Sequence, residues 1–189
     1  MRIVMMGPPG SGKGTQGVQV ATSYGIPHIS SGAVLRAGAG PELLSQMAAG
    51  ELIDDETIAG LIWARLGEPD AATGFVLDGF PRDVEQAGAL DTFLQERGDR
   101  LDAVVLLEAP REELQQRMLA RAETEQRPDD NPTTIARRLD VYENETAPLI
   151  ELYAGKGVLR RVDGAGDPVE IAARLSSALE SGPATPDSR

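Results

Sequence analysis

Residues 7–15, GPPGSGKGT, combine the residue types that bind a chain of phosphates. They match GxxxxGK[ST] through Lys13, with Gly14 next and the threonine one position later at Thr15, and they have an apolar segment before the loop and a helical pattern after it. Glycines let consecutive backbone N–H groups point inward, and the start of a helix adds its positive end. Lys13 is then placed for the β- and γ-phosphates, and the Thr15 hydroxyl for Mg²⁺. This motif favours a nucleoside triphosphate site over a Gly-rich turn of purely structural use.

Further along the chain, a carboxylate and several arginines are spaced for work on phosphates. Asp78 ends an apolar run, where a carboxylate can hold Mg²⁺ through water. Arg82 follows a Gly-Phe-Pro turn, and Arg117 and Arg121 are four residues apart, so they share one face of a helix. Guanidinium groups stay charged and donate paired hydrogen bonds to phosphate. Each arginine alone is typical of a solvated surface, but the set indicates phosphate binding.

These side chains need a scaffold, and apolar runs alternating with amphipathic segments indicate one. Continuous apolar strands between helices predict an α/β fold, with a parallel sheet of about five strands covered on both faces. Residues 1–180 read as one folding unit, and residues 181–189 as a disordered tail. The expected strands are 2–6, 74–77, 102–108 and 158–162, and the expected helices are 15–24, 55–66, 83–97, 111–121, 133–154 and 168–179.

Composition narrows the classes of protein. The 189 residues carry a formal charge of −12, which argues against a nucleic-acid surface, although a local cationic cluster can still hold a small phosphorylated ligand. We find no transmembrane run and no secretory leader, so we expect a cytoplasmic protein that does not engage a membrane. With no cysteine and one histidine, we expect no structural zinc.

Four motifs in order resemble the adenylate kinases of the nucleoside monophosphate kinase family. They are GPPGSGKGTQ, HISSGAVLR at 28–36, GFVLDGFPR at 74–82 with Gln86 four residues on, and the stretch from RAETEQRPDD at 121–130 to ENETAPLIELY. The similarity runs from Met1 to about Leu179. It implies a P-loop NTPase-type fold with two small mobile insertions, an acceptor segment at about 30–53 and a short lid at about 120–130.

The resemblance also implies roles for individual residues. The catalytic set is Lys13, Arg82, Arg121, Arg127 and Arg138. ATP would lie against Gly10, Ser11, Gly12, Lys13, Gly14, Thr15, Arg117, Arg121 and Gly166, whose carbonyl would meet the donor adenine. AMP would lie against Ser31, Arg36, Glu51, Leu52, Ile53, Gly79, Phe80, Pro81, Arg82, Gln86, Arg127 and Arg138. Mg²⁺ would arrive with ATP and be held by Thr15 and, through water, by Asp78.

The reaction that the resemblance implies is ATP + AMP ⇌ 2 ADP, in adenylate energy homeostasis and purine salvage, performed by a monomer. The acceptor oxygen is already ionised near pH 7, so the lone histidine, His28, is not expected to act as a base. Two departures stand out. Ala33 replaces the acidic residue usual after the Ser-Gly pair, and the stretch from Arg36 to Gly50 looks short.

Two other functions remain open from the residues. A UMP/CMP kinase of the same fold is one, and Gln86 argues for adenine against it. A non-catalytic nucleotide-binding protein is the other, and we would expect such a protein to have lost the arginines of the lid. An assay of ADP production against a panel of monophosphates separates the three.

Overall fold

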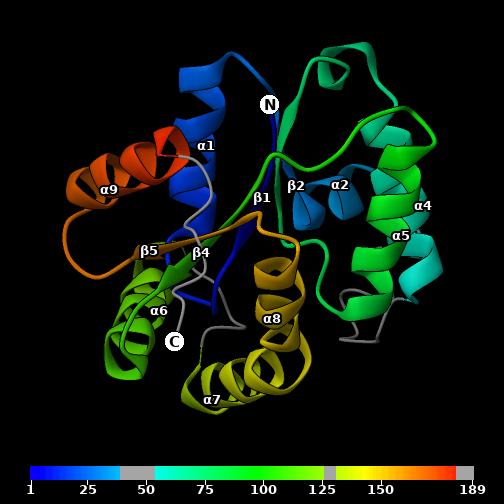
Figure 1. The fold of residues 1–189 in the computed structure, drawn as a ribbon. Coiled ribbons are helices and arrows are strands. Elements are labelled where there is room, and N and C mark those ends of the chain that lie inside the picture. Colours follow the sequence, from blue (N-terminus) through cyan, green and yellow to red (C-terminus); the bar gives the residue numbers. More distant parts are fainter. Residues whose placement is uncertain (39–53, 126–130, 182–189) are drawn as a thin grey trace.

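The computed structural model describes residues 1–38, 54–125 and 131–181 of the 189-residue chain. Strands and helices alternate along it (Figure 1). The elements are β1 (Arg2–Met6), α1 (Lys13–Tyr24), β2 (His28–Ser30), α2 (Ser31–Gly38), α4 (Asp55–Leu66), η1 (Pro69–Ala71), β3 (Phe75–Asp78), α5 (Val84–Gln95), β4 (Ala103–Glu108), α6 (Arg111–Glu125), α7 (Pro132–Val141), η2 (Tyr142–Thr146), α8 (Pro148–Gly155), β5 (Leu159–Asp163) and α9 (Pro168–Glu180).

The strands of the described part form one parallel sheet in the order β2-β3-β1-β4-β5. β1 is central: Ile3 lies opposite Val76 of β3 on one side and Ala103 of β4 on the other. The chain order reverses across β1, since β3 lies on one side of it and β4 on the other. Ligands of open α/β sheets bind beyond the carboxyl ends of the strands at such a point, which is where the phosphate-binding motif begins.

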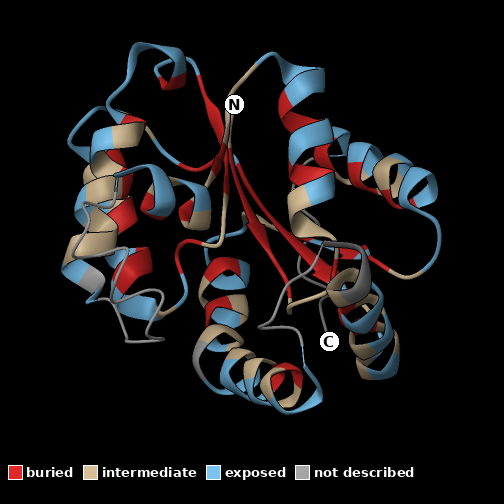
Figure 2. Ribbon diagram, turned by 180° about the vertical axis from the view of Figure 1, so that it is seen from behind, coloured by how far each residue is buried: buried red, intermediate tan, exposed pale blue. Residues whose placement is uncertain are grey.

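Helices cover both faces of the sheet, and alternate residues of each strand feed two separate cores (Figures 1 and 2). Val4 and Met6 of β1 point to the core under α4, α5 and α8, which we call the first core. Ile3 and Met5 point to the second core, under α1 and α9. Strands buried on both faces read as unbroken apolar runs, which explains why RIVMM and AVVLLE were recognisable in the sequence.

A third and much smaller core joins α6 to α7. Its buried residues among those described are Leu114 and Met118 of α6 with Ile135 and Leu139 of α7. Asn131 caps the start of α7, because its side chain accepts a hydrogen bond from the Thr134 amide at 3.0 Å. The buried cluster of this helix pair is therefore separate from the two cores that cover the sheet.

The predicted fold class is confirmed, and the named strands agree within one residue at each end. Two short elements, β2 and α2, were not predicted as such. β2 has three residues and two of them are polar, which leaves no apolar run to recognise. The prediction of one α-helix over 133–154 was wrong, because α7 and α8 are separated by the π-helical segment η2.

Proline explains that interruption. Pro148 has no N–H to donate, and its ring collides with the carbonyl four residues back in a regular helix. The chain widens instead, so that the Ala147 amide donates to the carbonyl of Tyr142, five residues earlier, at 2.9 Å. Single π turns of this kind are common at functional sites, and Tyr142 and Thr146 line the cleft described below.

No helix in the described ranges is both long and apolar enough to cross a membrane.

Candidate active site

The loop between β1 and α1 has the backbone that its glycines predict. Gly10 and Gly12 have φ angles of +84° and +89°, a region that side chains with a Cβ rarely adopt. At Gly7 a Cβ would come within 2.5 Å of the Leu107 carbonyl oxygen, so the loop runs against β4 without room for a side chain. The N-terminus of α1 begins at Lys13, and this geometry suits an anion at the loop.

Lys13 folds back over the loop, where its Nζ donates to the carbonyls of Gly7 at 2.7 Å and Pro8 at 3.0 Å. Burial lowers the pKa of this ammonium from its usual 10.5 to about 8, and nearby Asp78 opposes that shift. Neighbouring cations lower the pKa further, and they are Arg138, Arg82 and Arg121. A negatively charged phosphate chain bound here would offset the repulsion between Lys13 and these arginines.

Asp78 at the end of β3 lies beside the start of α1. A Cβ placed on Gly14 would come within 3.5 Å of the Asp78 Oδ2 atom, and Thr15 follows in the first turn of α1. Both Asp78 and Thr15 line the cleft. A carboxylate and a hydroxyl are oxygen ligands that suit Mg²⁺, which keeps most of its water shell and needs few protein groups. The residues present therefore fit a magnesium ion that arrives with a nucleotide.

The turn after Asp78 is held by hydrogen bonds from three sides. The Gly79 carbonyl accepts from the Ser31 hydroxyl at 2.9 Å and from Arg82 Nε at 3.0 Å. The Arg82 amide donates to Gln86 Oε1 at 2.8 Å. Asp83 caps α5 by accepting from the Gln86 amide, also at 2.8 Å. These hydrogen bonds thus join three residues from separate parts of the chain, Ser31, Arg82 and Gln86, to the same turn.

On the opposite side of the cleft, α6 and the loop before α9 share a carboxylate. Glu113 Oε1 accepts from Arg117 Nη2 at 2.6 Å and from the Gly166 amide at 3.3 Å. Arg117 Nη2 also donates to the Gly166 carbonyl at 3.2 Å. The structure therefore brings Arg117 and Gly166 together, as the resemblance implied, and Glu113 is the link that sequence reasoning did not find.

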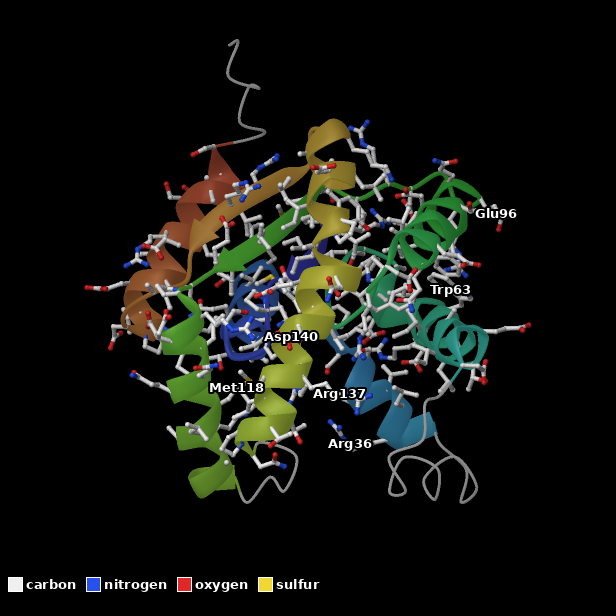
Figure 3. All side chains as sticks on the ribbon, turned by 90° about the horizontal axis from the view of Figure 1, so that it is seen from below. Arg36, Trp63, Glu96, Met118, Arg137 and Asp140 are labelled. Atoms are coloured by element: carbon white, nitrogen blue, oxygen red, sulfur yellow. The ribbon has the colours of Figure 1, made fainter. Side chains whose placement is uncertain are left out.

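A cleft of about 960 Å³ unites these parts. That volume is at the upper end of the range for small-molecule sites. Seen from below in Figure 3, Arg36 of α2 and Arg137 of α7 extend toward the space between their helices. Asp78 is the one carboxylate among its described lining residues, whereas the cations there are Lys13, Arg36, Arg82, Arg117, Arg121, Arg137 and Arg138. A protein of net charge −12 thus concentrates positive charge where anionic ligands would bind.

Most of the predicted site residues meet at this cleft. Those that line it are Gly10, Gly12, Lys13, Gly14, Thr15, Ser31, Arg36, Asp78, Gly79, Pro81, Arg82, Arg117, Arg121, Arg138 and Gly166. Ser11, Phe80 and Gln86 are not among the residues that line it, and these residues are 0%, 1% and 6% exposed. Glu51, Leu52, Ile53 and Arg127 lie outside the described residues, as does most of the stretch from Arg36 to Gly50 that we expect to be short.

Several lining residues were not predicted as ligands, notably Thr134, Arg137, Tyr142 and Thr146. Arg137 and Arg138 are adjacent on a helix that presents both to the cleft, a placement that the packing of α7 on α6 decides. The spacing of Ile135 and Leu139, four residues apart on the buried side, was the available signal.

His28 also lines the cleft. Its Nε2 atom is buried against Gly17 of α1 and has no hydrogen-bond partner in the part of the chain that the structure describes. Burial lowers the pKa of His28 below its usual 6.5, although Asp78 opposes the shift. The imidazole is therefore neutral near pH 7 and packs against α1.

Comparison with known proteins places this architecture in one family. The family model described as adenylate kinase matches residues 5–158. A protein named adenylate kinase from Xanthomonas campestris pv. campestris (strain B100) is 48% identical over 185 residues, covering 95% of this chain and 99% of the relative. Another with that name, from Stenotrophomonas maltophilia (strain K279a), is 47% identical over 186 residues and is covered completely. The chain, with a phosphate-binding loop and clustered arginines in one cleft, belongs to the adenylate kinase family.

Proposed function

We propose that the chain catalyses the reversible transfer of the terminal phosphoryl group of ATP to AMP, giving two ADP. The observation that carries this function is the convergence of the phosphate-binding loop with a ring of cations in a single cleft. Near full-length similarity to relatives named adenylate kinase supports the same reaction. A cleft of this charge suits two phosphorylated ligands that face each other.

Within that reaction, the cations act on the charge of the transferring group. Lys13 lies at the loop, Arg82 on the turn after β3, and Arg138 on α7, so positive charge approaches from three directions. We assign the same role to Arg121, and to Arg127 from the sequence resemblance. The protein contributes position and electrostatic stabilisation, since phosphoryl transfer between ionised oxygens needs no strong base. His28, which is neutral near pH 7 and packed against α1, is consistent with a reaction that uses no catalytic base.

Thr15 and Asp78 are the residues that we propose for Mg²⁺, which supplies neutralising charge on the phosphates when it is bound with ATP. Asp78 Oδ2 lies against Gly14 and its carboxylate interacts with Lys13, and Thr15 is in the same first turn of α1. Chelation should abolish turnover and leave the melting temperature of the nucleotide-free protein unchanged. A large fall in that temperature on chelation would reveal a structural metal instead.

The donor nucleotide is proposed to lie along Arg117, Arg121 and Gly166. Arg117 is already oriented by Glu113, and the Gly166 backbone is held to the same carboxylate. The Gly166 carbonyl is the group that we assign to the donor adenine. Arg36 of α2, and Ser31, whose hydroxyl donates to the Gly79 carbonyl of the turn after β3, are assigned to the acceptor side.

Gln86 is proposed to select adenine as the acceptor base. Its Oε1 atom accepts from the Arg82 amide at 2.8 Å, which fixes the carboxamide beside the turn. A carboxamide carries both a donor and an acceptor, the pair that adenine presents with its amino group and the adjacent ring nitrogen. A site built on such pairing rejects a base that leaves it unmatched, at a cost of about 1–3 kcal/mol per unpaired group. The Gln86 side chain would then determine both which acceptor nucleotide is bound and where the Arg82 backbone lies.

The deciding experiment measures kcat/KM for AMP, UMP, CMP and GMP with ATP as donor. We expect AMP to be favoured by roughly tenfold to a hundredfold. Gln86→Ala should reduce the preference for AMP over the other monophosphates, chiefly by lowering kcat/KM for AMP. A pyrimidine nucleotide that matches AMP would move the assignment to a UMP/CMP kinase, and no ADP with any acceptor would mean a non-catalytic nucleotide-binding protein.

We further propose that the segments at about 30–53 and 120–130 close over the two nucleotides, because a site open to water would lose the phosphoryl group to hydrolysis. An analogue that joins two adenosines through five phosphates should protect both segments from hydrogen exchange. Equal exchange with and without it removes the two-lid proposal. From the resemblance we also carry over a monomer, to be tested by size-exclusion chromatography. From the sequence pattern we propose a cytoplasmic location, to be tested by cell fractionation.

A further inference from the structure

Three aromatic side chains form a row of ring contacts that starts at the turn carrying Arg82, and none of them lines the cleft described above. Trp63 of α4 and Phe93 of α5 stack with ring centroids 4.6 Å apart and an interplanar angle of 17°. Trp63 also meets Phe80 edge to face, at 5.5 Å and 86°. We call Trp63, Phe80 and Phe93 the aromatic stack. Trp63 lies where α4 faces α5 (Figure 3).

The outer end of the stack is closed by a cation. Arg97 places its guanidinium 3.9 Å from the centroid of the Phe93 ring, and neither residue lines the cleft. The inner end is closed by burial, since Phe80 is 1% exposed and belongs to the first core. The rings therefore run from the surface of the molecule to the backbone of the Gly79–Arg82 turn.

That turn fixes Arg82. The Arg82 side chain is oriented through its Nε bond to the Gly79 carbonyl, and its amide through Gln86 of α5. Phe80, one of the two residues between Gly79 and Arg82, has its ring in the stack. The turn is therefore connected to α5 in two ways. Gln86, near the start of α5, accepts a hydrogen bond from the Arg82 amide. Phe93, near the end of α5, contacts Trp63, which in turn contacts Phe80 of the turn.

We propose that Trp63 is a positioning residue for the acceptor nucleotide, acting through Phe80 on the turn that carries Arg82. Protein interiors are packed densely, so the indole ring of Trp63 restricts the orientation of the Phe80 ring. Offset and edge-to-face ring pairs contribute beyond the area they bury. A phosphate-binding arginine is sensitive to small displacements, since a shift of about 1 Å can cost a hundredfold in rate.

The location of Trp63 makes the effect specific to one substrate. It lies on α4, the helix that follows the predicted acceptor segment, and on the β3 side of the cleft. The donor groups Arg117 and Gly166 are on α6 and the loop before α9 instead. The affinity for AMP should therefore depend on Trp63, and the affinity for ATP should not.

This inference rests on the proposed function, and the test separates the two. Trp63→Leu removes both ring contacts; Trp63→Phe keeps an aromatic ring at the same place. Leu66→Ala is the matched control, because Leu66 is one turn further along α4, 5% exposed and in the same core, but is not part of the stack. For each protein, KM for AMP, KM for ATP, kcat and the melting temperature are measured, and AMP binding is titrated by calorimetry without turnover.

Trp63→Leu should raise both KM and Kd for AMP about tenfold, which corresponds to about 1.4 kcal/mol, with KM for ATP within twofold. Trp63→Phe should restore most of the AMP affinity. Leu66→Ala should lower the melting temperature without moving either KM. An unchanged KM for AMP in Trp63→Leu overturns the proposal, and so does an equal rise for both nucleotides or the same AMP effect in Leu66→Ala. Absence of ADP formation in the unmutated chain would overturn the proposed function itself.

Discussion

The two sides of the cleft are built on very different foundations. Lys13, Asp78 and Arg82 extend from the carboxyl edge of the sheet, whose strands are buried on both faces by the first and second cores. Arg121 and Arg138 stand on α6 and α7, which are joined by Leu114, Met118, Ile135 and Leu139. The groups that we propose for the phosphate chain therefore stand on the two large cores, and the arginines Arg121 and Arg138 stand on the small one.

This difference teaches how stability is distributed. Regions with few buried apolar contacts open at lower free energy than the global core, and moving parts of enzymes come from that class. The α6–α7 pair also relies on ion pairs at the surface, since Arg111 contacts Asp140 at 2.7 Å and Glu143 at 2.6 Å. Exposed pairs of this kind contribute little. We expect the helix pair to move against a sheet edge that stays in place.

The largest expected effect compares one charge from each side. Lys13→Met and Arg138→Met should each lower kcat by about 10³-fold or more, as removal of a cation from a transferring phosphoryl group does elsewhere. The chain has a second lysine, Lys156, which pairs with Asp91 at the surface and offers a matched control. Lys156→Met should keep nearly normal kcat. A Lys13→Met or Arg138→Met variant with normal kcat at saturating substrate contradicts the electrostatic role on that side.

A pair of equal truncations tests the foundations themselves. Leu139 of α7 and Leu175 of α9 are 2% and 1% exposed, so Leu→Ala removes the same group from the small core and from the second core. Leu175→Ala should lower the free energy of unfolding by about 2–5 kcal/mol and leave kcat nearly unchanged. Leu139→Ala should lower kcat severalfold and speed hydrogen exchange in α6 and α7, with a smaller change in global stability.

The stability of the two Leu→Ala variants is compared by urea unfolding. Their kcat and hydrogen exchange are compared at a temperature below the melting midpoint of both variants. If both lost the same global stability and both kept kcat, the helix pair would be part of the main cooperative unit, and the contrast drawn above would be wrong.

The smallest expected effect concerns pH and belongs to the sheet side alone. Burial holds the pKa of Lys13 at about 8, whereas arginines stay charged throughout. Above pH 8 the free protein loses the Lys13 proton, so kcat/KM for ATP should fall toward tenfold per pH unit. Bound phosphates favour the ammonium, so kcat should persist to higher pH. A kcat/KM that stays flat to pH 9.5 would place the lysine in a more solvated site.

Stability should respond to the same group with the opposite sign. Between about pH 8 and the usual 10.5, the unfolded chain binds a proton at Lys13 that the folded chain has lost. The Lys13 contribution to the free energy of unfolding therefore rises with pH across this window. Comparison of denaturation curves for the unmutated chain and Lys13→Met isolates that contribution.

Some of the site was readable from local sequence, for a physical reason. The backbone of residues 7–15 follows from its glycines and from the strand and helix on either side, so Lys13 and Thr15 could be placed by position alone. Asp78 was equally legible, because a strand buried on both faces ends at its first charged residue. The arginines Arg82, Arg121 and Arg138 were named by resemblance, and the cleft contains all of them.

Other features were decided only when distant segments packed together. Glu113 reads as an ordinary helical carboxylate, yet it holds both Arg117 and the Gly166 backbone. Trp63 reads as a core residue, and its contact with Phe80 depends on how α4 and α5 lie on the sheet. Local sequence determines backbone geometry over a few residues and which faces are apolar. Which side chains meet across the cleft depends on long-range packing, and no periodicity along the chain encodes it.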